Sequence, residues 1–277
     1  MSDFEEFLFA MEIILFGVCV ALTVLFLIKW YRPIAKAWPK ARARTAKVLL
    51  SLLPIVVCAG LLLTLTVFAD QYVKTHAFYI LFYLFMGFAW LLANAGLMRA
   101  CFDLSSRDDA LYADNKATIL PSLYGLLGLS VIYAGSNVGD GPGFYCVVFA
   151  YALGAVVWFI LAFILNKTAG VFERVTVERD TGCGIRLGCY FLAAGIILAR
   201  ACSGDWTSFG RTVVEMADGW LIAPLFILAL VVEKVYAVRA KNEYAVPDEK
   251  SSTPSVLWGA VYIVAAVASI FIPSIMG

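Results

Sequence analysis

Charged residues are scarce in this chain of 277 residues, at 15% of the total, and histidine occurs only once, as His76. A single histidine excludes bis-histidine haem ligation and zinc sites of the H-E-x-x-H type. No Gly-rich loop ending in G-K-[ST] is present to hold a nucleotide phosphate. We therefore expect no metal and no cofactor. Because no nucleophile is paired with a base, we also expect a protein that is not an enzyme.

We expect no nucleic acid as a partner. The formal net charge is only +1, and the basic residues lie at the ends of apolar runs rather than in one patch. The seven cysteines form no C-x-x-C pair, so we interpret them as free thiols that pack as small apolar side chains. The expected partners are the lipid bilayer and either a second copy of the chain or another subunit of a membrane complex.

Hydrophobic residues are abundant, at 62% of the chain. A helix that spans a bilayer needs about 20 consecutive, mostly apolar residues. Eight such runs are present: 7–28, 48–69, 77–98, 117–134, 143–165, 184–201, 213–232 and 255–276. The sequence therefore predicts an all-α, polytopic transmembrane helical bundle of about eight spans, whose loops are too short to form a soluble domain.

The basic residues predict the orientation of these spans. Of the 21 lysines and arginines, 18 fall on one side, and only Lys74, Arg200 and Arg211 fall on the other. Positive charge favours the cytoplasmic side, so we expect both termini to lie outside the cytoplasm. The basic segment 29–47 either only fixes this topology or also lies on the membrane surface, where anionic headgroups attract it.

The fourth and sixth predicted spans are similar to each other. With an offset of 67 residues, Gly128 aligns with Gly195 and Ala117 with Gly184. Both spans cross the membrane in the same direction, and each follows a span that crosses in the other direction. This spacing favours parallel two-helix repeats, and a chance spacing of small residues is the alternative.

A wider pattern of small and aromatic residues covers residues 77–206. It consists of an aromatic-rich fifth span together with Tyr83, Gly87, Asn115, Ala117, Gly125, Gly128, Gly195, Ile196, Ile197, Ala199, Cys202 and Trp206. This pattern resembles the YjfL type, a bacterial inner-membrane family with a small four-helix domain. The resemblance implies a bacterial inner membrane and no particular activity. It divides the chain into an N-terminal hairpin with a basic cytoplasmic loop (1–76), a YjfL-like domain (77–206) and a C-terminal hairpin (207–277).

Small residues also mark candidate helix contacts. Five glycines recur at helical spacing on the fourth and sixth spans: Gly125, Gly128, Gly184, Gly188 and Gly195. Glycine lets two helix backbones approach closely, so we expect tight packing there, and a glycine-lined path is the alternative. Asn94 is an amide deep in the third span, and we expect it to form an interhelical hydrogen bond.

A second candidate site is a cluster of charges at the outer end of the bundle: Arg200, Asp205, Glu215, Asp218 and Asp140. Arg200 lies in the last turn of the sixth span, and we expect it to pair with Glu215 or Asp218. Such a pair would form a gate or a cation vestibule. In the alternative, Arg200 extends to the lipid headgroups beside interfacial acids. We expect the same of Arg186, one turn inside the cytoplasmic face.

The sequence favours two functions. The small-residue packing faces favour a non-enzymatic scaffold or accessory subunit of the inner membrane. The charged outer mouth favours a channel-like or transport-related protein instead. Because no acid is predicted near the middle of the membrane, a proton-coupled transporter is disfavoured.

Overall fold

The computed structural model describes residues 3–37, 44–242, 253–273 and 275, and its regular secondary structure is entirely helical within them. The long helices are α1 (Asp3–Ala37), α2 (Arg44–Val67), α4 (Ala77–Phe102), α5 (Ile119–Gly135), α6 (Phe144–Ala169), α8 (Thr181–Ala201), α10 (Ile222–Asn242) and α11 (Thr253–Ser269). Short helices join them: α3 (Gln71–Thr75), the π-helix η1 (Ser106–Tyr112), the 3-10 helices η2 (Lys116–Thr118) and η3 (Met216–Gly219), α7 (Val171–Thr176) and α9 (Phe209–Glu215). The predicted all-α class is confirmed.

Six helical segments are long and apolar enough to cross a membrane, and they coincide with the first six predicted spans. The seventh predicted span is a bent pair, in which Phe209–Gly219 and Ile222–Val238 meet at 48°. The helix α11 has 17 residues, and the eighth predicted run extends beyond it to residues 274 and 276, which lie outside the described residues. At about 1.5 Å per residue, α11 is shorter than a hydrocarbon core of about 30 Å. The count of eight spans stays a prediction.

The surface of the long helices is apolar, as a bilayer requires. Ile14 on α1 is 68% exposed, Phe163 on α6 is 57% exposed and Val264 on α11 is 67% exposed. In water such a surface would favour aggregation, whereas lipid chains solvate it without cost. These exposed side chains and the candidate spans together fit a membrane-embedded helical bundle.

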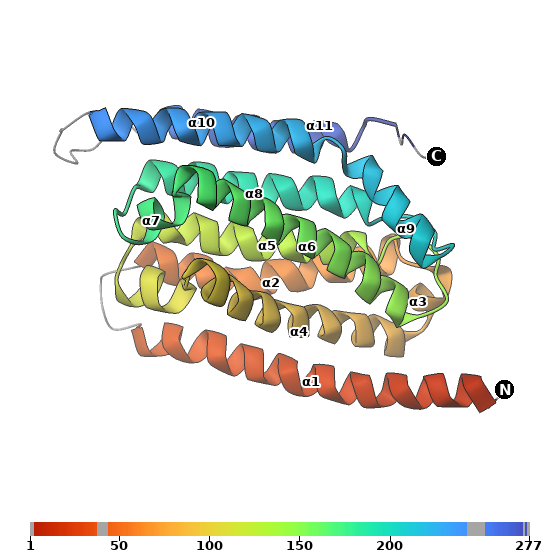
Figure 1. Cartoon of the computed structure of the whole chain (residues 1–277). Helices are drawn as coiled ribbons and strands as arrows, with labels where there is room; N and C mark the ends of the chain where they lie inside the picture. The colour runs from red at the N-terminus through yellow and green to blue at the C-terminus, as the bar shows by residue number, and fades with distance from the viewer. Residues whose placement is uncertain (1–2, 38–43, 243–252, 274, 276–277) are drawn as a thin grey trace.

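The long helices lie side by side, with α1 along one edge of the bundle and α10 with α11 along the other (Figure 1). Between these edges α5 packs on α8, α2 packs on α5, and α11 packs on α8. One buried apolar cluster extends from Cys19 on α1 to Ala266 on α11. The predicted boundaries at residues 76 and 206 therefore cross a shared core, and the division into three segments stays a prediction.

The offset of 67 residues that aligns the fourth predicted span with the sixth also relates α4 to α6. Both ends of α6 lie 67 residues after the corresponding ends of α4. Each of the two helices also ends in a left-handed residue, Asp103 with φ 51° and Gly170 with φ 61°. Gly128 and Gly195, the residues aligned by the offset, are in direct contact. These matches support the predicted parallel two-helix repeat.

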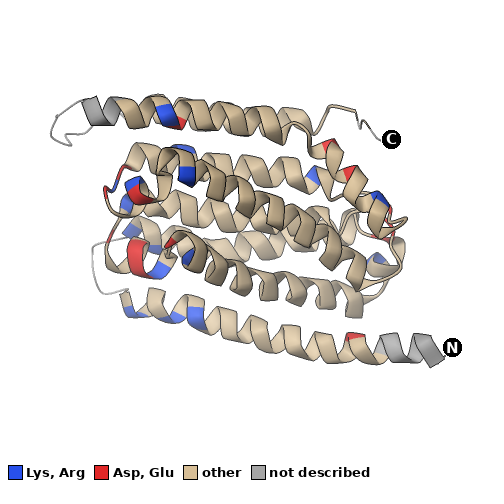
Figure 2. Ribbon diagram, viewed as in Figure 1, with Lys and Arg blue, Asp and Glu red and all other residues tan. Residues whose placement is uncertain are grey.

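Most lysines and arginines gather at one end of the bundle, where α1, α4 and α6 end and α2, α5 and α8 begin (Figure 2). We call this the basic end. The helix α1 begins and α11 ends at the opposite end (Figure 1). Lys40, Arg42 and Lys250, which contribute to the predicted charge asymmetry, lie outside the described residues, as does the rest of 38–43 in the basic segment.

Candidate functional site

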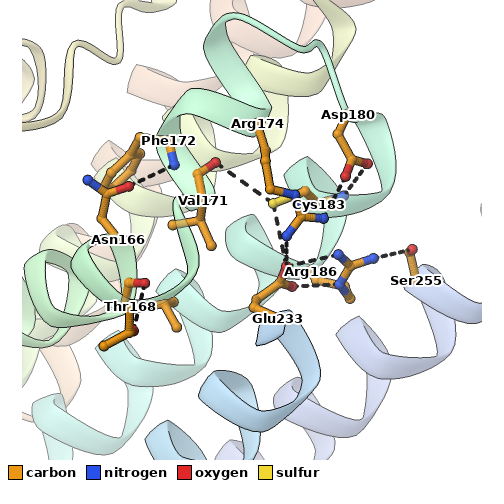
Figure 3. Close-up of polar contacts among 11 residues, drawn as sticks. Asn166, Thr168, Val171, Phe172, Arg174, Asp180, Cys183, Arg186, Glu233 and Ser255 are labelled. Carbon is orange, nitrogen blue, oxygen red and sulfur yellow. Dashed lines mark hydrogen bonds and ion pairs between the residues drawn. The ribbon is translucent and has the colours of Figure 1, made fainter. Parts of the chain in front are cut away.

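Four charged side chains meet inside the bundle near the basic end (Figure 3). We call Arg174, Asp180, Arg186 and Glu233 the buried charge cluster. The side chains of Arg186 and Glu233 are 1% and 2% exposed, and that of Arg174 is 7% exposed. Charges are costly at such burial unless each finds a partner, so this cluster is the strongest candidate for a functional site.

The turn between α6 and α8 brings Arg174 and Asp180 into place. Gly170 ends α6 in a left-handed conformation, and the Asn166 side chain accepts a hydrogen bond from the Phe172 N–H at 3.0 Å. The chain then forms α7, which carries Arg174. Asp180 is the N-cap of α8, where its Oδ1 accepts a hydrogen bond from the Cys183 N–H at 2.8 Å.

Glu233 on α10 is the centre of the cluster. Its Oε1 accepts a hydrogen bond from Arg186 Nε at 2.6 Å, and its Oε2 accepts from Arg186 Nη2 at 2.9 Å. Arg174 Nη1 donates to the same Oε2 at 2.9 Å, while its Nη2 donates to Asp180 Oδ2 at 2.6 Å. Both oxygens of Glu233 are thus bound by guanidinium groups, in the bidentate geometry that makes such pairs strong.

Other side chains complete the surroundings of Arg186. Its Nη1 donates a hydrogen bond to Ser255 Oγ on α11 at 2.7 Å, and its guanidinium carbon lies 3.9 Å from the centre of the Tyr236 ring. The Cys183 thiol lies 3.5 Å from Glu233 Oε2. The cluster therefore connects α7, α8, α10 and α11, and it joins the last two helices to the centre of the bundle.

Two guanidinium groups face two carboxylates, so the cluster is neutral as a whole. Burial raises the pKa of Asp180, but the Cys183 N–H and the Arg174 guanidinium outweigh burial, and the pKa lies below its usual range. One polar atom is left over: Arg174 Nε has no hydrogen-bond partner among the described residues. Removing one partner of a buried ion pair costs about 3–5 kcal/mol, because the other charge is left unpaired.

The expectation that Arg186 extends to the lipid headgroups is wrong. Its side chain is fully enclosed, because Glu233 and Ser255 come from helices that pack against α8. Glu233 was missed because it directly follows the apolar run 213–232. One signal was available: Glu233 is the only acidic residue between Asp218 and Glu243.

The predicted outer charge cluster lies at the opposite end of the bundle, and its members are satisfied separately. Arg200 Nη2 donates to the Ile272 carbonyl at 2.7 Å, and its Nη1 lies 3.4 Å from the Asp218 carbonyl oxygen. Glu215 pairs with Arg211 at 2.9 Å. Within the described chain, Arg200 makes no ion pair with a carboxylate, so backbone carbonyls replace the expected acid partner.

Two of the remaining acids of this cluster, Asp205 and Asp218, bind backbone amides. Asp205 Oδ1 accepts a hydrogen bond from the Asp140 N–H at 2.9 Å, and Asp218 Oδ1 accepts from the Ile275 N–H at 2.8 Å. The Asp140 carboxyl lies against that of Asp70, and a hydrogen bond with Asp70, together with the negative charge of Asp70, raises the pKa of Asp140. Asp70, Asp140, Asp205 and Glu215 also line a small cavity of about 60 Å³.

The packing glycines lie where close contact was expected. A Cβ on Gly184 would collide with Ala117, one on Gly188 would lie 2.8 Å from the Leu120 carbonyl carbon, and one on Gly195 would collide with Gly128. All three contacts join α8 to α5 or to the 3-10 helix η2 directly before it. For Gly125, a Cβ would meet the flexible end of the Met98 side chain at 2.5 Å.

The predicted interhelical hydrogen bond of Asn94 is confirmed. Asn94 Nδ2 and Oδ1 lie 2.8 and 2.9 Å from the Tyr151 hydroxyl, which connects α4 to α6. Among the described residues no group of three or more His, Cys, Asp or Glu side chains is placed to hold a metal ion.

The fold and the site together define the class of a membrane-embedded helical bundle with a buried charge cluster. No protein-family model, curated protein or solved structure matches this chain. The resemblance to the YjfL-type family therefore stays a prediction that rests on the residues between 77 and 206.

Proposed function

We propose that this protein is a non-enzymatic scaffold or accessory subunit of a bacterial inner membrane. The observation that carries this proposal is the saturation of Glu233: both of its oxygens are bound by Arg174 and Arg186 from within the chain. A carboxylate held in this way is already neutralised by two guanidinium groups, so it offers little attraction to a passing cation. Its role is to fasten α10 and α11 to α8.

The packing of α5 on α8 supports the same role. The helices touch backbone to backbone at Gly128 and Gly195, where even one added methyl group would collide. The Trp158 ring fills the space beside them, and its Nε1 donates a hydrogen bond to the Phe191 carbonyl at 3.0 Å. Backbone contact and large buried side chains favour a rigid support over a conducting path between these helices.

An ion-flux measurement in sealed liposomes tests this proposal. We expect liposomes that contain the purified full chain to release cations at the rate of protein-free liposomes, and an ionophore added at the end shows that the vesicles were sealed. Faster release in the presence of the protein would contradict the scaffold role.

A channel-like function is the second candidate, and the cavity lined by Asp70, Asp140, Asp205 and Glu215 favours it. A ring of carboxylates concentrates cations at a pore entrance. This alternative predicts protein-dependent cation flux that falls when Asp140 and Asp205 are both replaced by Asn. Lys167→Gln, at the basic end, is the matched control and should leave the flux unchanged.

A further inference from the structure

A cavity of about 450 Å³ opens at the basic end, away from the buried charge cluster. Its walls come from α1, α4, the start of η1 and α5. This volume lies within the range of about 300–1,000 Å³ that small-molecule sites occupy. The cavity has a charged rim and an apolar interior, and these two parts point to one kind of ligand.

Four basic residues line the rim: Lys29 and Arg32 on α1, Arg99 on α4 and Arg107 on η1. Arg99 and Arg107 share the Asp108 carboxylate, at 3.1 and 2.9 Å. Lys29 and Arg32 are exposed and have no ion-pair partner in the part of the chain that the structure describes. The rim therefore has cationic groups available for an anion.

The interior combines apolar side chains with one unsatisfied hydroxyl. Phe26, Trp30, Leu92 and Leu126 belong to the apolar lining. Ser122 on α5 also lines the cavity, is 3% exposed, and its Oγ has no hydrogen-bond partner among the described residues. Burying a hydroxyl without a partner is unfavourable, so a ligand that brings an acceptor would gain a hydrogen bond here.

The flanks of the cavity are suited to lipid chains. Ile28 on α1, which lines the cavity, is 54% exposed and belongs to the first candidate span. A ligand with an anionic headgroup, ester carbonyls below it and acyl chains would match the rim, Ser122 and these flanks in that order. A free phosphate would match the rim alone.

We propose that this cavity binds an anionic phospholipid, with its phosphate at Lys29, Arg32 and Arg99 and its ester region at Ser122. This site goes beyond the scaffold role, because it adds lipid selectivity at a place that the buried charge cluster does not touch. Each basic residue near an anionic headgroup contributes about 1 kcal/mol, so two of them change affinity by more than about tenfold.

Lipid binding to the purified full chain, followed by native mass spectrometry, tests the proposal. We expect phosphatidylglycerol to bind at least about tenfold more tightly than phosphatidylcholine, which carries no net charge. Inorganic phosphate should displace little of the bound lipid. Equal affinity for the two lipids would overturn the proposal, and so would full displacement by phosphate, which would identify a site for a free anion.

Gly96→Phe tests whether the cavity itself is the site. Gly96 lines the cavity, and a Cβ there would meet nothing within 4 Å, so the added ring can enter the cavity while the backbone stays in place. We expect phosphatidylglycerol affinity to fall to the level of phosphatidylcholine. Gly60→Phe on α2, where a Cβ also meets nothing within 4 Å, is the matched control and should bind as the unmodified protein does.

Lys29→Gln combined with Arg32→Gln keeps the cavity open and removes charge from its rim. This variant should lose more than about tenfold in phosphatidylglycerol affinity. Lys36→Gln, on the same helix but outside the cavity lining, should bind normally. If the double variant binds as tightly as Lys36→Gln, the proposed site is wrong, whatever the outcome for Gly96→Phe or for ion flux.

Discussion

Asp180 binds one partner with each of its two carboxylate oxygens, and protonation of this carboxylate weakens its pairing with Arg174. One oxygen caps α8 and the other binds Arg174. Because the pKa of Asp180 is lowered on folding, its contribution to the free energy of unfolding is complete above the ordinary carboxyl pKa and is lost as the pH falls through the lowered value. We expect thermal stability in detergent to fall as the pH is lowered below about 4.

Asp180→Asn should remove this part of the pH dependence, since the amide can still cap the helix but cannot titrate. Asp140→Asn is the comparison of opposite sign. The pKa of Asp140 is raised, so its contribution is complete below the ordinary carboxyl pKa and is lost as the pH rises through the raised value. If Asp180→Asn and the unmodified protein lose stability in parallel on acidification, Asp180 does not carry the effect.

At the scale of whole helices, the contact between α5 and α8 depends on Gly195. A leucine there would press against the backbone of Gly128, and overpacking of this kind costs about 1–3 kcal/mol or more. We expect Gly195→Leu to lower the unfolding temperature in detergent clearly. Gly60→Leu should change it little, because a Cβ on Gly60 meets nothing within 4 Å. Equal losses in both variants would show that the glycine contact does not limit stability.

The helices and the closely packed face of α8 could be predicted from the sequence, because both depend on local properties, whereas α5 as the partner of that face could not. Apolar run length predicts where a helix crosses lipid, and glycine spacing predicts which face packs closely. The buried charge cluster depends on which hairpins are neighbours: Arg186 and Glu233 are 47 residues apart, and Arg186 and Ser255 are 69 apart. Hydropathy contains no information about that pairing, so the sequence alone places Arg186 at the lipid headgroups.

For Arg200 the sequence indicated the right region and the wrong acceptor. Acidic side chains are indeed near the end of α8, but the chain after α11 brings the Ile272 carbonyl to Arg200. Every residue carries a backbone carbonyl, so the pattern of charged residues cannot indicate which carbonyl accepts the Arg200 hydrogen bond.

At the scale of the whole molecule, the charge asymmetry predicts which end faces the cytoplasm. A reporter that is active only outside the cytoplasm should be active when fused after Gly277 and inactive when fused after Lys241. The basic end would then face the cytoplasm, in agreement with the positive-inside rule. The reverse pattern of reporter activity would contradict this orientation.

Buried charges fasten the last two helices to the rest of the bundle, and a double-mutant cycle on Arg186 and Glu233 tests this role most directly. Unfolding free energies in detergent are measured for Arg186→Gln, Glu233→Gln and the combined variant, while Asp180 continues to neutralise Arg174. We expect each single change to cost about 3–5 kcal/mol and the combined change to cost clearly less than their sum. The exposed pair Arg211 and Glu215 is the control, with an expected coupling of about 0–1 kcal/mol. If the two changes at Arg186 and Glu233 instead add within about 0.5 kcal/mol, the cluster does not fasten these helices.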